Sequence, residues 1–275
     1  MNRIILRSLP AALLALGLAA CQQQQSGSDT TDQATAASPD NNDAARPEPS
    51  TSSQGAASGD TGPLQAAEGF DRDRLDIYAP FELNADLSHL SADQKAMLGK
   101  LIEAGKIMDE LFWRQAFGKP EPLLGRIEGA KLRRFAAYNY GPWDRLAGNQ
   151  PFLQGFGPKP EGANYYPADM SKDEFRAWDN PDKDGLYSLV RRAEDGSLKL
   201  RPYNIAFEDR LTRAAALLRE AAEWAANESF ANYLRLRADA FESNEYRASD
   251  RAWMDVAGNA VDVVIGPFET YADQL

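Results

Sequence analysis

Few residue types in this chain can hold a transition metal or act as a nucleophile. The sequence of 275 residues contains one histidine, His89, and one cysteine, Cys21. A catalytic zinc site with two histidine ligands therefore cannot come from this chain, and neither can a multi-cysteine metal site or an internal disulfide. A serine nucleophile would have only His89 as its base. We expect no catalytic residue and no metal ligand in this chain, with His89 in a turn or capping role.

Two acidic motifs resemble known sites without completing them. Residues 180–185 (NPDKDG) copy the start of a calcium loop, but Arg191 stands where a bidentate glutamate must close the cage. Residues 219–223 (REAAE) resemble the centre of the Nudix box, which places several glutamates on a helix around magnesium. Leu211 and Trp224 occupy positions where that box needs glutamate. A polar turn and a solvated helix face are the expected structures.

The amino-terminal residues have the pattern of a secretory leader. Arg3 and Arg7 precede a short apolar run at 9–18, whereas a membrane-spanning helix needs about 20 apolar residues. Residues 18–21 (LAAC) resemble the bacterial lipobox. This resemblance implies that the leader 1–20 is removed and that Cys21 carries the lipid. We therefore expect a lipid-anchored protein of the bacterial cell envelope, at the outer membrane and facing the periplasm or the cell surface.

Residues 21–68 have the composition of a linker. They are mostly Gln, Ser, Thr, Asp, Gly, Ala and Pro, with Leu64 as the only large aliphatic residue, and no aromatic residue precedes Phe70. Such a segment buries too little apolar surface to offset its chain entropy. The sequence thus predicts a disordered linker at 21–68 and a folded domain at 69–275. The net charge of −11 disfavours nucleic acid as a partner, because phosphate would be repelled.

The folded part is expected to be mainly α with a minor β component, an α+β helical lobe with one β-hairpin. Ser91 and Gln94 form a capping-box pattern in front of apolar residues spaced three and four apart, which predicts a helix to about residue 117. Asp195-Gly196 predicts a two-residue hairpin turn. The other expected elements are helices starting at 171 and covering 208–226 and 228–245, hairpin strands at 186–190 and 198–201, and a last strand at 261–265.

Several strings in the folded part are similar to one family of enzymes. They are ADLSHL (85–90), GPW (141–143), GANYYP (162–167), RADAF (237–241), SDRAWMD (249–255) and IGPFETY (265–271). Through them, residues 81–275 resemble the N-terminal portion of bacterial members of the dipeptidyl peptidase III family, which are zinc-dependent hydrolases. The resemblance implies a cleft between two lobes, in which the region before the zinc helix helps to bind a peptide.

The family's zinc helix, His-Glu-x-x-Gly-His, is missing from this sequence, as its single histidine requires. The resemblance places that helix beyond residue 275. It implies that this chain is the N-terminal, non-catalytic part of a membrane-anchored zinc peptidase, a fragment or one part of a split form, which binds no zinc alone and takes a peptide substrate only in the full-length form. By motif matching, Asp262, Glu269 and Tyr271 are substrate-side residues, with Asp262 standing where glutamate is expected. The alternative is a non-enzymatic, surface-anchored binding or interaction lipoprotein.

Overall fold

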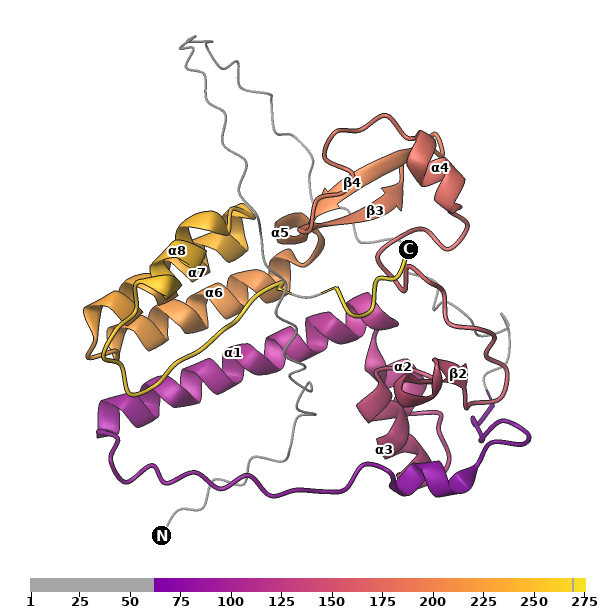
Figure 1. The fold of residues 1–275 in the computed structure, drawn as a ribbon, viewed down its shortest axis with the longest axis horizontal. Coiled ribbons are helices and arrows are strands. Elements are labelled where there is room, and N and C mark those ends of the chain that lie inside the picture. Colours follow the sequence, from indigo (N-terminus) through magenta and orange to yellow (C-terminus); the bar gives the residue numbers. More distant parts are fainter. Residues whose placement is uncertain (1–61, 269) are drawn as a thin grey trace, which may run out of the picture.

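The computed structural model describes residues 62–268 and 270–275. The predicted leader, Cys21, most of the predicted linker and Glu269 lie outside these residues. The described chain is mainly helical with two small antiparallel sheets, which confirms the predicted fold class (Figure 1). Its elements in order are η1 (Arg72–Asp76), α1 (Ala92–Ala116), α2 (Pro120–Leu124), α3 (Ala130–Asn139), β1 (Trp143–Asp144), η2 (Arg145–Ala147), β2 (Gln150–Pro151), α4 (Lys172–Ala177), β3 (Ser188–Arg192), β4 (Leu198–Pro202), α5 (Tyr203–Ala206), α6 (Glu208–Glu223), α7 (Glu228–Ser243) and α8 (Arg247–Met254).

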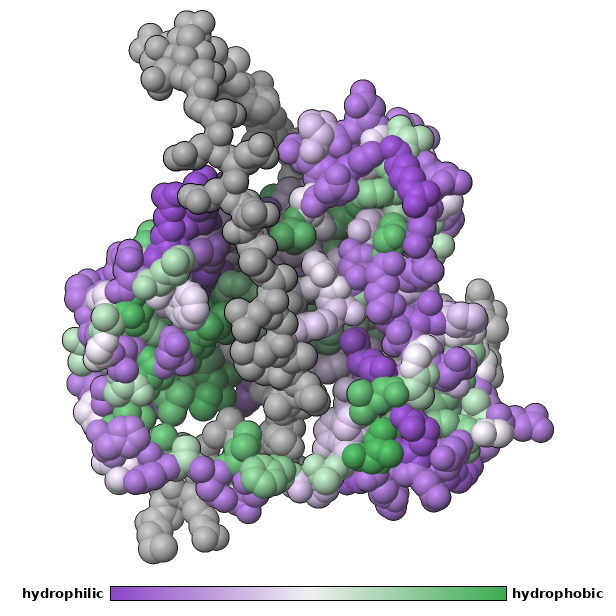
Figure 2. All heavy atoms as spheres, in the orientation of Figure 1, coloured by the Kyte–Doolittle hydropathy of each residue, from purple (hydrophilic) through white to green (hydrophobic). Residues whose placement is uncertain are grey.

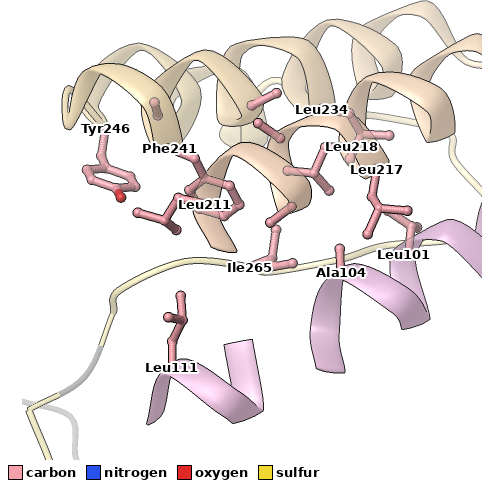
Figure 3. Packing of buried hydrophobic residues seen from close by; sticks show 14 of the residues in the cluster. Leu101, Ala104, Leu111, Leu211, Leu217, Leu218, Leu234, Phe241, Tyr246 and Ile265 are labelled. Carbon is pink, nitrogen blue, oxygen red and sulfur yellow. The ribbon is translucent and has the colours of Figure 1, made fainter. Parts of the chain in front are cut away.

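Helix α1 begins at the capping box that the sequence predicts. The Ser91 side chain accepts a hydrogen bond from the Gln94 amide, and the Gln94 side chain accepts one from the Ser91 amide. The apolar face of α1 packs against α6, and α6 packs in turn against α7. Leu101 and Ala104 of α1 lie in one core with Leu217 and Leu218 of α6 (Figure 3).

We call this core the helical cluster. Alanines at contact positions of α6 and α7 let the two helices approach closely, and larger side chains fill the space on either side. Its fully buried large residues include Leu217, Leu218, Phe230, Tyr233, Leu234 and Phe241. Because these residues recur every three or four positions, one face of each helix is covered and the opposite face stays polar.

A second core, the aromatic cluster, is built from short elements and loops. Its residues are Leu64, Ala66, Trp113, Phe117, Leu123, Ile127, Leu132, Phe135, Ala136, Trp143, Phe152 and Leu153. The Phe135 and Phe152 rings meet edge to face with centroids 4.8 Å apart. The Trp143 indole N–H donates to the Gly157 carbonyl at 2.8 Å, so its polar atom is satisfied.

The last residues of the predicted linker pack on the folded part. Leu64 and Ala66 are buried in the aromatic cluster. The Leu64 amide donates to the Arg126 carbonyl at 2.7 Å, and the Ala67 amide donates to the Phe152 carbonyl at 2.8 Å. Composition did not reveal this contact, because one leucine and one alanine barely raise the mean hydropathy of a polar stretch. Each side chain nevertheless fills a place in a core that other segments supply.

The β3–β4 hairpin forms where expected, but its turn differs from the predicted one. The Ala193 amide donates to the Ser197 carbonyl at 2.8 Å, and the Gly196 amide donates to the Ala193 carbonyl at 3.0 Å. The loop thus has three residues rather than two, and Gly196 alone takes a positive φ, at 83°. Asp195 instead uses its carboxylate to accept from the Ser197 amide at 3.0 Å, which favours this wider loop.

The strand expected at 261–265 is not formed. Residues 261–268 run as an extended segment beside the helical cluster, with no strand paired to them among the described residues (Figure 1). Buried and exposed side chains nevertheless alternate along this segment. Ile265 is buried between α1 and the α6–α7 pair (Figure 3), while Val264 is exposed. Hydrophobic residues appear on the molecular surface in this part of the view (Figure 2). Val264 and Phe268 of the segment, and Trp253 and Met254 before it, are exposed.

Candidate functional site

A cavity of about 510 Å³ lies between the β3–β4 hairpin, α4 and the C-terminal segment. In Figure 1 the C-terminus reaches this end of the molecule, beside α4 and the end of α1. Its apolar walls come from aromatic and aliphatic side chains, namely Tyr165, Tyr166, Phe175, Leu186, Val190, Tyr203, Pro267 and Phe268. Apolar walls of this size with a few polar groups are typical of small-ligand and peptide side-chain sites.

The polar floor of the cavity is centred on Asp273. The Tyr166 hydroxyl donates to Asp273 Oδ2 at 2.7 Å, and the Leu275 amide donates to Asp273 Oδ1 at 3.1 Å. Burial and the bond to Asp273 raise the pKa of Tyr166, and burial raises the pKa of Tyr165 to about 12. Both phenols therefore stay protonated at neutral pH and serve as hydrogen-bond donors.

The C-terminal segment is attached to the loop that carries Tyr165 and Tyr166. Lys159 Nζ donates to the Ala272 carbonyl at 3.1 Å, and the Gln274 amide donates to the Glu161 carbonyl at 2.8 Å. Gly162 allows this loop to close, because a side chain at that position would overlap the Tyr166 ring. Ala272 is fully buried. The cavity wall formed by residues 270–275 therefore has its own fixed contacts.

The cations at the cavity rim are already engaged by neighbouring groups. Lys172 Nζ lies 2.6 Å from Glu161 Oε2. Lys183 Nζ donates to three carbonyls at the end of α4, where the helix dipole is negative. Asp273 therefore provides a carboxylate inside a cavity whose nearby positive charges are held by other partners. This arrangement suits an apolar or aromatic group with a hydrogen-bond donor at one end.

The residues nominated from the sequence do not come together at this cavity. Asp262 is exposed and accepts a hydrogen bond from Trp253 Nε1 at 3.2 Å. Tyr271 is also exposed, and neither residue lines the cavity. Glu269 lies outside the described residues. Thr270, which stands between Glu269 and Tyr271 in the sequence, lines the cavity. The nominated segment thus borders the cavity, but the polar contacts described above belong to its neighbours.

The other motifs tested from the sequence have structural roles. Residues 180–185 form turns, with the Asp182 amide donating to Asn180 Oδ1 at 2.9 Å. Arg191, at the position of the missing calcium ligand, donates to the Tyr165 and Asn164 carbonyls and so holds that loop to β3.

In the Nudix-like stretch of α6, the charged groups face other side chains. Glu220 Oε2 lies 2.7 Å from Lys100 Nζ, and Arg219 bridges Asp239 and Glu242 on α7. Leu211 is buried in the helical cluster. The stretch is an ion-paired helix surface.

A zinc ion does not fit the described residues. His89 is exposed in the turn before α1. Across residues 62–268 and 270–275, no three His, Cys, Asp or Glu side chains are grouped so that they could hold a metal ion. None of the described helices is long and apolar enough to cross a membrane.

Sequence reasoning missed two residues that organise this region. Asp273 follows the last matched string and carries no motif of its own. Arg237 lies on the apolar stripe of α7 in series with Phe230, Leu234 and Phe241, and it is 1% exposed. A charged residue at a core position of a helical repeat is the signal that identifies a buried cation.

Comparison with known proteins gives one curated relative and two solved structures. No family model matches the sequence. The curated relative, Nudix hydrolase 3 from Arabidopsis thaliana, is 30% identical over 265 aligned residues, covering 74% of this chain and 34% of the plant protein. The structure of DPP III from Caldithrix abyssi is 38% identical with a TM-score of 0.67, covering 74% of this chain and 41% of that one. Dipeptidyl-peptidase III from Corallococcus sp. strain EGB is 36% identical with a TM-score of 0.68, covering 73% and 40%.

These likenesses relate the chain in fold and sequence to the dipeptidyl peptidase III peptidases, and so to a family of hydrolases. The chain spans about a third of the curated relative and about two fifths of the two solved proteins. The name of the plant relative refers to a different hydrolase class, whose motif is incomplete in this chain.

Proposed function

We propose that this chain supplies the substrate-side, non-catalytic part of a zinc-dependent peptidase of the dipeptidyl peptidase III family. The observation that carries the proposal is the likeness to two DPP III structures at 38% and 36% identity over about three quarters of the chain. The metal ligands of such an enzyme would come from residues outside this chain, because the described residues do not fit zinc. No chemical step is therefore assigned to this chain.

The role of this chain in the proposed enzyme is to bind and orient a peptide. The cavity at the C-terminal segment offers apolar walls for a side chain and Asp273 as an acceptor for a peptide N–H or ammonium group. Asp262, Glu269 and Tyr271 remain our candidates for further peptide contacts along the same segment. Fixing the peptide in one orientation contributes to catalysis, since it removes motions that the reaction must otherwise restrict.

We also propose that lipid on Cys21 anchors the chain to a membrane of the bacterial cell envelope, at the outer membrane. The basis is the leader pattern in residues 1–20 followed by the LAAC string. Several acyl chains hold a protein stably where a single chain binds only reversibly. The linker would then separate the folded part from the membrane. Mass spectrometry of the amino-terminal peptide from bacterial membranes tests this, with acylated Cys21 expected and an unmodified Met1 contradicting it.

Peptide binding by the full chain tests the proposed function. Isothermal titration calorimetry with a tetrapeptide that carries an aromatic side chain should detect binding that a chelator leaves unchanged, with no dipeptide released. Leu186→Asp places a charge in the cavity wall and should weaken binding about tenfold. Leu146→Asp is the matched control, because Leu146 and Leu186 are 65% and 62% exposed and only Leu186 lines the cavity.

Equal loss of binding in both variants, or no binding by the unaltered chain at millimolar peptide, would contradict the proposal. The gene sequence after codon 275 separates it from the alternative of a non-enzymatic binding lipoprotein. An open frame that continues into His-Glu-x-x-Gly-His supports the peptidase. A stop codon there, together with peptide binding, supports the binding lipoprotein.

A further inference from the structure

Helix α7 buries a guanidinium group inside the helical cluster. Arg237 is 1% exposed and has one carboxylate partner, Asp250 on α8, whose Oδ1 lies 2.5 Å from Arg237 Nη2. The Asp250 side chain itself is 44% exposed. Arg237 Nε and Nη1 are buried without a hydrogen-bond partner among the described residues. The charge is thus only partly compensated by polar contacts.

Three aromatic rings enclose the same group. The Arg237 Cζ atom lies 5.6 Å from the Tyr233 ring centroid, 5.5 Å from that of Tyr246 and 5.1 Å from that of Phe268. All three distances are within the range of a cation–π interaction. Tyr233 lies in α7 and Tyr246 directly before α8, whereas Phe268 lies in the extended segment 261–268. The guanidinium therefore connects two parts of the molecule.

Stability alone is a weak reason for a charge at this position. A buried ion pair often contributes no more than a well-packed apolar side chain of similar volume, because desolvating the charges is costly. The two unpartnered nitrogens of Arg237 add to that cost. Neighbouring positions of the same stripe, Leu234 and Phe241, are apolar and fully buried. The cation is therefore more readily explained by the segment that it contacts than by the core around it.

That segment, residues 261–268, rests on the helices mainly through apolar side chains. Among the described residues it pairs with no strand, Ile265 is buried in the helical cluster, and Val261 and Val263 pack against that cluster. The Trp253 bond to Asp262 and the contacts of Arg237 also join the segment to the helices. Gly266 has φ 140°, and a Cβ atom there would lie 2.9 Å from Arg237 Nη1. The guanidinium is thus pressed against the backbone of Gly266 on one side and the ring of Phe268 on the other.

We propose that Arg237 is a positioning residue that fixes the segment 261–268 on helices α7 and α8, a contact that we call the clamp, and thereby sets the position of the cavity wall that follows. Pro267, Phe268, Thr270 and Asp273 line that cavity, and all four come within seven residues after Gly266 in the chain. The link from this clamp to peptide binding rests on the proposed function. The clamp itself is a property of the chain that can be measured without any substrate.

Spin-label mobility at Val264 tests the clamp. Val264 is 56% exposed, so Val264→Cys accepts a label without disturbing the core, in full chains that carry Cys21→Ser. We expect an immobilised EPR spectrum with Arg237 present and a largely mobile one in Arg237→Met. The melting temperature of Arg237→Met should stay the same or rise, because methionine removes the cost of a desolvated cation, so that a mobile label would report release of the segment and not loss of the fold. Arg237→Lys keeps the cation and should give an intermediate spectrum.

Arg219→Met is the matched control, because Arg219 also bridges carboxylates on α7 but makes no contact with the segment. Its label spectrum should equal that of the unaltered chain. If Arg237→Met fails to fold, Phe268→Leu decides, since Phe268 is 47% exposed and its loss removes the ring on the segment side. An immobile label in Arg237→Met, or in Phe268→Leu where Arg237→Met does not fold, would overturn the clamp.

Peptide affinity then connects the clamp to function. In Arg237→Met, we expect the tetrapeptide to bind about tenfold more weakly, with Arg219→Met unchanged. A mobile label with unchanged peptide affinity would retain the clamp and reject its link to the cavity. A mobile label in the variant, with no peptide binding even by the unaltered chain, would retain the clamp and reject the proposed function.

Discussion

The helical cluster and the aromatic cluster both bury large side chains, but they draw them from different kinds of backbone. The helical cluster takes its residues mainly from α1, α6 and α7, and alanines such as Ala214 and Ala238 allow close helix packing. The aromatic cluster takes rings from α1, α3 and loops, and aliphatic side chains from Leu64 and Ala66. The helical cluster is a repeated pattern along regular helices, whereas the aromatic cluster depends on single residues from distant parts of the chain.

This difference predicts how each core should respond to the loss of a side chain. In the helical cluster a lost side chain affects helices that pack continuously on one another. In the aromatic cluster the segments are held by a few contacts each, so that one segment can detach while the rest persists. Substitutions in the two cores should therefore differ in how large and how local their effects are.

Phe241→Ala should cause the largest loss of stability, because Phe241 is fully buried in α7. Truncation of a buried phenylalanine costs about 3–5 kcal/mol. Since α7 packs on both α6 and α8, the loss should appear as a lower free energy of unfolding for the whole helical lobe. Urea denaturation followed by circular dichroism measures it. A change below about 1 kcal/mol would mean that the packing described here is wrong.

Leu64→Ala should have a smaller and more local effect. Removal of a buried leucine costs about 2–5 kcal/mol, with the lower end where the surroundings can relax. Residues 64–67 bond to the backbones of Arg126, Glu128, Phe152 and Gln154, and these amide bonds should open before the helical lobe unfolds. Hydrogen exchange should increase at residues 64–67 and 126–128 and stay unchanged in α6. Equal acceleration in both regions would show one cooperative unit.

Mild acid should produce the smallest effect, on the polar rim of the helical cluster. Hydrogen bonds from Arg219 hold the pKa of Glu242 below its usual 4.5. Because the folded state lowers this pKa, the contribution of Glu242 is present above pH 4.5 and is lost as the pH falls through the lower, folded value. Glu242 is partly exposed, so the contribution is about 0.2–1 kcal/mol. Glu242→Gln should flatten the pH dependence of unfolding in this window by that amount, and an unchanged slope would contradict the pairing.

The same contrast explains which parts of the fold are readable in the sequence. Helix α1 follows from its capping box and three-to-four residue spacing, and α6 and α7 follow from spacing alone, since local pattern and burial agree there. Leu64 and the unpaired segment 261–268 could not be inferred, because their state is set by partners remote in the chain. The alternation that suggested a strand at 261–265 is real, but it reflects packing of Ile265 on helices rather than pairing in a sheet.

The candidate site was located only approximately from the sequence. The string at 265–271 lies beside the cavity, because Pro267, Phe268 and Thr270 line it, and a substrate role for Asp262, Glu269 and Tyr271 stays a prediction. Its polar centre, Asp273 with Tyr166, joins residues more than a hundred positions apart, and no spacing rule connects them. Arg237 was readable in principle, as a charge on the apolar stripe of α7.

We propose above that this chain is part of a zinc peptidase whose metal is held by residues outside it. Elemental analysis of the purified full chain, combined with an assay of dipeptide release with and without a chelator, tests this directly. We expect zinc far below one ion per chain and no release that depends on the metal. One tightly bound zinc ion per chain, together with hydrolysis that the chelator abolishes, would contradict the account.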